Sequence, residues 1–237
     1  MENIKTEKIG IIAAVETEIY SFIKDINIKN STNIAKVTFI EGYFANKNIV
    51  VAISGIGKVS AAICAQIMID EFNITSLINI GTAGSLQKHL PLDSFVVSKD
   101  AVYGDVDVRV LGYKYGEIAN INIQYFNADK QLHDKAILAC KNIYKNKNVL
   151  SGRIFTTDKF SIEPITLNKI LNEIGGDCME MEGAAIAHIA YLNNIPYVII
   201  RHISNYVNEK AEEQYLENHE DASSILKPII QELLSLI

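Results

Sequence analysis

Two glutamates, Glu180 and Glu182, flank Met181 and stand directly before a run of small apolar residues. The pattern predicts a short strand over 177–180 and a helix over 182–193. The glutamates then mark a strand-to-helix turn, where open α/β sheets place their ligand sites. Glu182 is therefore a candidate for chemistry. The competing interpretation is that Glu182 only complements the positive end of the helix that it starts, and this stretch alone favours that interpretation.

Two glycine-rich stretches follow apolar runs of strand length: SGIGKV (54–59) and GTAGS (81–85). Backbone amides of the first can hold an anion at a helix N-terminus. Its glycine-to-lysine spacing is not that of a P-loop, and it lacks the third glycine of the dinucleotide fingerprint, so a tight packing turn is an equally good interpretation. The second stretch repeats the arrangement with Thr82 at a strand end. These two turns and the acidic turn predict a single crevice.

Apolar runs of strand length alternate with helical periodicity along the whole chain. Strands are predicted at 8–14, 36–44, 48–54, 76–80, 94–98, 149–156, 177–180 and 197–202. Helices are predicted at 16–26, 58–72, 129–144, 164–174, 182–193 and 220–236. Several strands are almost uninterrupted Ile, Val and Ala, as expected when helices cover both faces of a sheet. The sequence predicts an α/β fold, a three-layer α/β/α sandwich with a central mixed sheet, in a single domain over 1–237.

Two stretches depart from that alternation. Residues 36–44 alternate between polar and apolar and meet the next strand through 45–47, which predicts an antiparallel hairpin inside the mixed sheet. Residues 99–127 are rich in Gly, Tyr and Asp and fit no element. A loop that long in a compact domain is usually functional or interfacial.

Composition limits the class of protein. The chain has 237 residues, 49% of them hydrophobic, which is ample for a buried core. A formal net charge of -6 with few arginines argues against a nucleic-acid surface. The apolar run 9–15 is too short for a signal peptide or a membrane span. Cys64, Cys140 and Cys178 show no metal-ligand spacing. We expect a cytoplasmic protein with buried thiols, no metal, and no nucleic-acid or membrane partner.

Six sequence blocks together resemble one enzyme family. They are KIGIIAAVETEI (8–19), SGIGKVSAA (54–62), INIGTAGS (78–85), GYKYG (112–116), MEMEGAAIAH (179–188) and RHISN (201–205). In this order they resemble the 5′-methylthioadenosine/S-adenosylhomocysteine nucleosidases of the purine nucleoside phosphorylase superfamily, over nearly the whole chain. The resemblance implies a mixed-sheet α/β fold, a homodimer, no cofactor, and hydrolysis of the bond between adenine and a 5′-thio-substituted ribose.

The chemistry of that reaction requires particular side chains. Breaking an N-glycosidic bond builds positive charge on the sugar and negative charge on the purine. A carboxylate must stabilise the sugar, a second group must activate water, and an acid must protonate the purine. The resemblance implies that Glu182 holds the ribose hydroxyls and the cation, and that Glu18 positions the water. Arg201 would orient Glu182 through a charged contact.

The resemblance also implies a set of binding residues. Phe160 would stack on the purine, and Met181 would pack beside the sugar. Thr82 and Ser204 resemble polar wall residues. Ser161 takes the place of an apolar neighbour of the purine-stacking phenylalanine.

Residues farther along the substrate follow from the implied homodimer. Tyr215 occupies the position of an aromatic residue near the 5′ substituent. Val108 and Leu111 belong to the stretch that reaches the partner subunit's pocket.

Considered alone, these residues have simpler interpretations. Glu18 would be a solvated residue of a first helical turn, Phe160 a core residue and Arg201 a surface ion pair. His188 and His202 are better explained as core histidines than as catalytic bases.

One position departs from the family in a way that bears on catalysis. The family's RxISD motif ends in an aspartate, the general acid, whereas RHISN ends in Asn205. An amide cannot deliver a proton at accessible pH, and general acid–base catalysis contributes about 10²- to 10⁴-fold. We expect impaired adenine release, while binding can survive. Three explanations of Asn205 stay open. It is a natural substitution, it was introduced to trap a bound ligand, or it changes which purine base the site prefers. Gly104 also departs, because relatives often carry a larger polar residue.

Rival functions stay open. A purine nucleoside phosphorylase would use phosphate as nucleophile, which is disfavoured because buried phosphate usually requires arginine forks and Arg201 is the sole arginine within a motif. A 6-oxopurine nucleosidase would use the Asn205 amide to donate to the carbonyl oxygen or N7. A non-catalytic nucleoside-binding protein would bind tightly and release no product.

Overall fold

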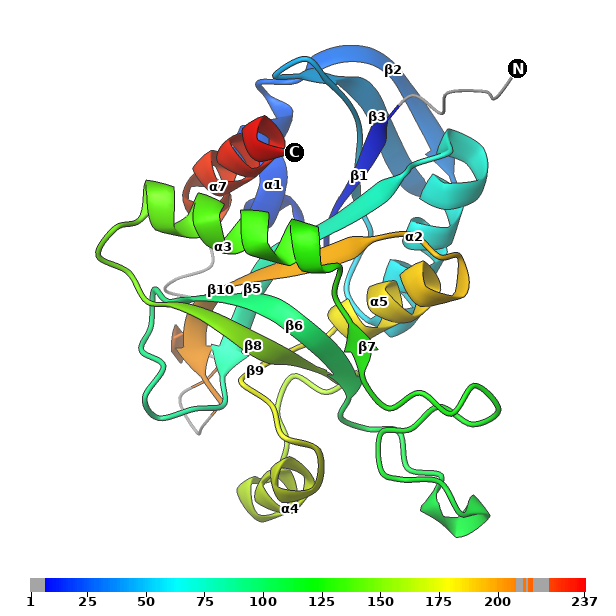
Figure 1. Cartoon of the computed structure of the whole chain (residues 1–237), viewed down its shortest axis with the longest axis vertical. Coiled ribbons are helices and arrows are strands. Elements are labelled where there is room, and N and C mark those ends of the chain that lie inside the picture. Colours follow the sequence, from blue (N-terminus) through cyan, green and yellow to red (C-terminus); the bar gives the residue numbers. More distant parts are fainter. Residues whose placement is uncertain (1–6, 208–210, 212, 215–221) are drawn as a thin grey trace.

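A computed structural model describes residues 7–207, 211, 213–214 and 222–237 (Figure 1). The strands are β1 (Lys8–Ala13), β2 (Asn27–Ile34), β3 (Val37–Phe44), β4 (Lys47–Ile53), β5 (Ser76–Ser85), β6 (Phe95–Tyr103), β7 (Phe126–Asn127), β8 (Val149–Thr156), β9 (Cys178–Glu180) and β10 (Tyr197–Tyr206). The helices are α1 (Glu16–Ile23), α2 (Lys58–Phe72), the 3₁₀ helix η1 (Arg109–Leu111), α3 (Lys130–Ile143), α4 (Pro164–Ile174), α5 (Gly183–Leu192) and α7 (Ala222–Leu236).

The strands form one 10-stranded mixed sheet, which confirms the predicted sheet type. β1 pairs in parallel with β4 on one side and β5 on the other. β3 and β4 form the predicted antiparallel hairpin, in which Phe44 pairs with Lys47. Ala45 and Asn46 between them have φ values of 48° and 63°. Positive φ at both central residues is what a two-residue hairpin turn of type I′ requires.

Helices cover both faces of the sheet, as predicted. Side chains of α2 and α5 pack in one buried cluster, and those of α1, α3 and α7 pack in another. Figure 1 shows the same division, with α1, α3 and α7 grouped apart from α2 and α5. All three cysteines are free and buried, as expected. No helix in the described part of the chain is long and apolar enough to cross a membrane.

β5 and β10 are longer than the sequence predicts, and this shapes the sheet. The prediction ended these strands at residues 80 and 202, and treated GTAGS as a turn. That was wrong, because Gly81 pairs with Arg201 and the pairing continues to Ser85. The end of β5 also pairs with β9, so β5, β9, β8, β6 and β10 close into a ring. Residues 81–85 are glycine-rich and polar, so they lack the apolar pattern of a strand. Backbone pairing with β10 gives them the strand conformation.

Two strands escaped prediction. β2 (NIKNSTNI) is mostly exposed and pairs with β3 at an edge of the sheet, so its composition carries little apolar alternation. β7 has only two residues and lies inside the 99–127 stretch that fitted no element. The same stretch contains the end of β6 and η1.

Candidate active site

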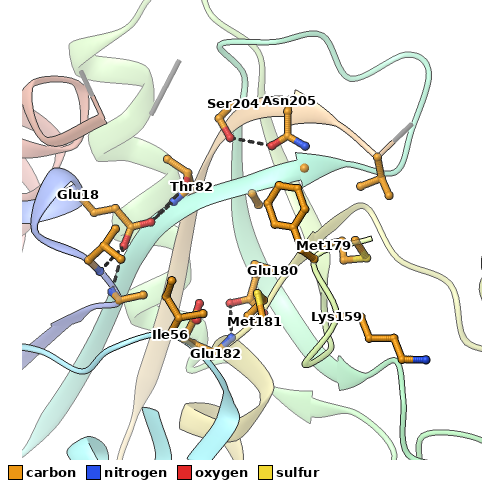
Figure 2. Close-up of a pocket in the computed structure, with 16 residues that line it drawn as sticks. Glu18, Ile56, Thr82, Lys159, Met179, Glu180, Met181, Glu182, Ser204 and Asn205 are labelled. Carbon is orange, nitrogen blue, oxygen red and sulfur yellow. Dashed lines mark hydrogen bonds between the residues drawn. The ribbon is translucent and has the colours of Figure 1, made fainter. Parts of the chain in front are cut away.

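A cavity of about 150 Å³ opens where the ends of β5 and β10 meet the β1–α1 and β9–α5 turns (Figure 2). The single crevice predicted from the glycine and acidic turns is therefore present. The predicted site residues that line it are Glu18, Thr82, Phe160, Met181, Glu182, Ser204 and Asn205. They come from segments almost 190 residues apart in the chain, and the closed ring of strands brings those segments together.

Glu18 is held by backbone amides on the inner side of α1. Its Oε2 accepts hydrogen bonds from the amides of Ala14 (3.0 Å) and Val15 (3.3 Å). Its Oε1 accepts from the Thr82 amide at 2.8 Å and the Thr82 hydroxyl at 3.2 Å. The carboxylate is only 5% exposed, so Glu18 is not a solvated helix-face residue. Its position is fixed from two separate elements, which suits a group that must orient a reactant.

Gly81 makes room for Glu18 and Arg201 to approach one another. A Cβ at residue 81 would lie 2.1 Å from Arg201 Nη1 and 2.7 Å from Glu18 Oε1. Both side chains are buried, so neither can move aside freely. We expect Gly81→Ala to lower the free energy of unfolding by about 1–3 kcal/mol through overpacking. Denaturant titration measures this, with Gly112→Ala as a control for a glycine whose Cβ would meet nothing within 4 Å but would be strained by φ of 90°. A smaller loss at residue 81 than at residue 112 would contradict the expectation.

Glu180 and Glu182 have separate tasks. Glu180 Oε2 accepts from the amides of Glu182 (3.1 Å) and Gly183 (2.7 Å) at the start of α5, and Glu180 also contacts Thr156 and Arg201. Glu182 is the N-cap residue of α5, but its side chain makes no cap hydrogen bond. Its Oε1 instead accepts from the Gly57 amide at 2.9 Å. Glu182 therefore provides no side-chain cap for α5, and Glu180 supplies the carboxylate that the amides at the start of α5 bind.

Burial controls the protonation of Glu182. The residue is only 5% exposed. Burial, and after it the neighbouring Glu180 carboxylate, raise the pKa of Glu182 to about 7, although Arg201 and the Gly57 amide oppose the rise. Desolvation penalises the charged form of a carboxyl group, which is the dominant cause here. Glu182 therefore exchanges its proton near neutral pH, as acids and bases in catalytic sites often do.

Arg201 lies behind the cavity and is completely buried, so it is not a surface ion pair. Its Nη2 donates to Asn79 Oδ1 at 2.7 Å and to Glu180. Glu182 Oε2 is farther away, at 3.7 Å. The contact that the resemblance implies is present, but the stronger carboxylate partner of Arg201 is Glu180. Arg201 thus pairs closely with Glu180 and acts on Glu182 as a more distant positive charge.

Asn205 lies near the end of β10, where the pairing with β5 shifts register between Ile203 and Asn205. Its Oδ1 accepts from the Ser204 hydroxyl at 2.9 Å, and its Nδ2 donates to the Tyr206 carbonyl at 3.2 Å. One Nδ2 hydrogen thus stays available for a ligand. Figure 2 shows Asn205 across the cavity from Met181 and Glu182. The amide can donate a hydrogen bond there but cannot transfer a proton.

Other predicted residues lie elsewhere. Ser161 is exposed and does not line the cavity, unlike its neighbour Phe160. Val108 directly precedes η1, and Leu111 is the last residue of η1 and is 68% exposed. Tyr215 lies outside the described residues. His188 stacks on Phe126 and His202 is buried against Asp93, and neither lines the cavity, in agreement with their interpretation as core histidines.

Several functional contacts were missed by reasoning from the sequence. Glu180, Ile56, Lys159, Met179 and Val207 also line the cavity, and Gly57 supplies the amide that holds Glu182. The SGIGKV motif did suggest an amide facing an anion, but it did not identify the anion as a glutamate of the same chain. Among the described residues, no group of three or more His, Cys, Asp or Glu side chains is arranged to hold a metal ion.

The strand ring, the pocket at the strand ends and its buried carboxylates define the class of protein. A family model described as "Phosphorylase superfamily" matches residues 8–235. A 5′-methylthioadenosine/S-adenosylhomocysteine nucleosidase of an Exiguobacterium species is 36% identical, with 91% of this chain and 92% of the relative covered. The chain therefore belongs to the 5′-methylthioadenosine/S-adenosylhomocysteine nucleosidase family, within the phosphorylase superfamily.

Solved structures of this family have the same fold. The nucleosidase of Colwellia psychrerythraea in complex with adenine is 30% identical with a TM-score of 0.92, covering 98% of this chain and 96% of that one. The nucleosidase of Neisseria meningitidis in complex with methylthio-immucillin-A has the same identity and TM-score, covering 98% of this chain and 100% of that one.

Proposed function

We propose that this chain hydrolyses the N-glycosidic bond of 5′-methylthioadenosine and S-adenosylhomocysteine, releasing adenine and the thioribose product. One observation carries the proposal: the buried carboxylates of Glu18 and Glu182 face a single cavity that is also lined by Asn205 (Figure 2). A water-activating group, a cation-stabilising group and a purine-binding group are the parts that such a reaction needs. The relatives that carry this activity in their names support it.

The carboxylates account for the sugar end of the reaction. Glu182 in its charged form accepts hydrogen bonds from the ribose hydroxyls and stabilises the positive charge that develops on the sugar. Glu18, held by amides of two elements, orients the attacking water and takes its proton. Met181 packs against the sugar and Thr82 contributes a polar wall. Desolvation strengthens the electrostatic contacts of the two carboxylates, because both glutamates are buried.

The other end of the cavity accommodates the purine. Phe160 stacks on the base, as an aromatic face does readily. The free Nδ2 hydrogen of Asn205 donates to N7, and Ser204 keeps the amide oriented through its hydroxyl. N7 receives a hydrogen bond and no proton, so the purine is a poorer leaving group than one that a general acid protonates. The chain thus binds its substrate well and turns it over slowly.

Water, and not phosphate, is the proposed nucleophile. Of the described residues that line the cavity, Lys159 is the only Lys or Arg, and Arg201 is buried behind it. A buried phosphate would need more cationic donors than that. We expect slow adenine release from 5′-methylthioadenosine at a rate that added phosphate leaves unchanged, measured by chromatography of the products. Turnover that requires phosphate would overturn the assignment as a hydrolase.

The proposal extends to assembly and location. A homodimer would bring Val108 and Leu111 of one subunit to the 5′ end of the partner's site. Exposed apolar residues support such an interface: Val59 on α2 is 71% exposed, and Val110 on η1 is 93% exposed. The buried free thiols suit the reducing cytoplasm.

A further inference from the structure

Lys58, the lysine of the SGIGKV motif, has no role in the proposed reaction, although its side chain makes several close contacts. It is the first residue of α2, and its side chain is only 19% exposed. Its Nζ lies 2.6 Å from Asp105 Oδ1 and 3.3 Å from Asp158 Oδ2. It also lies 5.6 Å from the centre of the Tyr103 ring, within the range of a cation–π contact.

The place of this lysine is unfavourable for the helix alone. A helix N-terminus carries partial positive charge, so a cation in its first turn is repelled. The two aspartates offset this repulsion. Asp158 also accepts from the Lys58 amide at 3.0 Å, and so caps α2 from 100 residues away. These contacts indicate that Lys58 serves to join α2 to the segments of Asp105 and Asp158, and not to stabilise the helix itself.

Asp105 completes a closed ring of contacts, called the Lys58 clasp from here on. Its Oδ2 accepts from the Asp158 amide at 2.9 Å and from the Thr157 hydroxyl at 3.2 Å. The clasp consists of Lys58, Asp105, Thr157 and Asp158. It joins the start of α2, the segment after β6 and the segment after β8, which are far apart in the sequence.

Both ends of the clasp continue directly into the cavity. On the α2 side, Ile56 lines the cavity and the Gly57 amide holds Glu182 at 2.9 Å. On the other side, Lys159 and Phe160 line the cavity directly after Asp158. The separation of these two rims therefore depends on the contacts of Lys58. The clasp fixes the support of Glu182 and the purine-stacking side chain relative to each other.

We infer that Lys58 is a positioning residue that sets the width of the nucleoside site by holding the 56–57 rim against the 159–160 rim. This inference rests on the proposed function. It predicts that the clasp acts on both the base and the ribose ends of one ligand. Displacement of either rim by about 1 Å is enough to cost 10- to 100-fold in binding or rate.

The test uses Lys58→Met, which keeps the apolar stem and removes the charge. Calorimetry with adenine should show affinity reduced by about tenfold, because only the Phe160 rim contacts the base. With 5′-methylthioadenosine in an Asn205→Asp background, KM should rise by about 10- to 100-fold while kcat changes little, because both rims contact the nucleoside. Lys58→Arg, which keeps the cation, should restore most of the affinity.

Two further variants separate positioning from folding. Lys227→Met removes a similar ion pair, 2.7 Å from Asp25, away from the cavity, and should leave adenine affinity unchanged. If Lys58→Met does not fold, the double variant with Asp105→Asn removes the unpaired charge and should show the same binding loss. Adenine affinity and KM unchanged in either clasp variant would overturn the inference alone. Failure of the unsubstituted chain to bind adenine would overturn the proposed function and the inference with it.

Discussion

Asn205→Asp is expected to raise the rate of adenine release from 5′-methylthioadenosine by about 10²- to 10⁴-fold, the usual contribution of a general acid. An aspartate has nearly the shape of asparagine, so it can keep accepting from the Ser204 hydroxyl. Protonated, it can donate to N7 and then transfer the proton as the glycosidic bond breaks. The measurement is the initial rate of adenine formation at saturating substrate.

Asn205→Ala is the matched control for this gain. It removes both the hydrogen bond and the proton donor, so we expect weaker adenine binding and no increase in rate. A rate unchanged by the aspartate, combined with tight binding in the unsubstituted chain, would favour a nucleoside-binding protein over an enzyme. A preference for 6-oxopurine nucleosides in the unsubstituted chain would instead indicate that Asn205 selects the base.

Glu182→Gln is expected to abolish most of the remaining activity and to stabilise the protein. The amide cannot carry the negative charge that stabilises the sugar cation, which should cost at least about 100-fold in rate. The same change removes a buried charge, while the glutamine oxygen can still accept from the Gly57 amide. A functional group that destabilises the fold is common at catalytic sites.

The sign of the pH dependence follows from the raised pKa of Glu182. Between its ordinary value of 4.5 and about 7, the folded chain keeps a proton that the unfolded chain has lost. Stability of the unsubstituted chain therefore falls as pH rises through that window, by up to about 3 kcal/mol. The Glu182→Gln variant does not lose stability in this way. Its free energy of unfolding should therefore equal that of the unsubstituted chain below pH 4.5 and exceed it most above pH 7. Activity of the unsubstituted chain should show the opposite trend, rising as Glu182 ionises.

Glu180→Gln provides the contrast. Glu180 is paired with the buried Arg201 and accepts hydrogen bonds from the amides of Glu182 and Gly183, so loss of its charge should destabilise the fold. Urea titrations of both variants from pH 5 to pH 8 distinguish the two glutamates. Stabilisation by both substitutions, or by neither, would contradict the separate tasks assigned to them.

The general architecture could be predicted because apolar strands are distinctive. β1 (KIGIIA) and the first half of β5 (SLINI) are mostly apolar, and burial on both faces of the sheet explains this composition. The second half of β5 could not be predicted, because Gly81 and Thr82 become strand residues only through pairing with β10. Local preference is weak where a neighbouring strand supplies the hydrogen bonds.

The site was predictable in its residues and less so in its contacts. The resemblance named Glu18 and Glu182, but nothing in the spacing of Glu180 and Glu182 says which one faces the helix and which faces the cavity. Gly104 was noted only as a departure, and its reason is long-range: a Cβ there would lie 2.0 Å from the buried Phe155 ring. Such contacts between distant segments are absent from any local pattern.

The closed ring of strands leaves an asymmetric protein. On the ring side, β5, β6, β8, β9 and β10 each find partners on both sides, whereas β2 pairs only with β3 among the described residues. β2 is thus an open edge to which another chain can add a strand, and its sequence, NIKNSTNI, presents lysine and asparagine instead of a long apolar surface. Polar and charged side chains on an edge strand discourage uncontrolled edge-to-edge pairing with other chains. The polar edge of β2 therefore disfavours edge-to-edge pairing between copies of this chain.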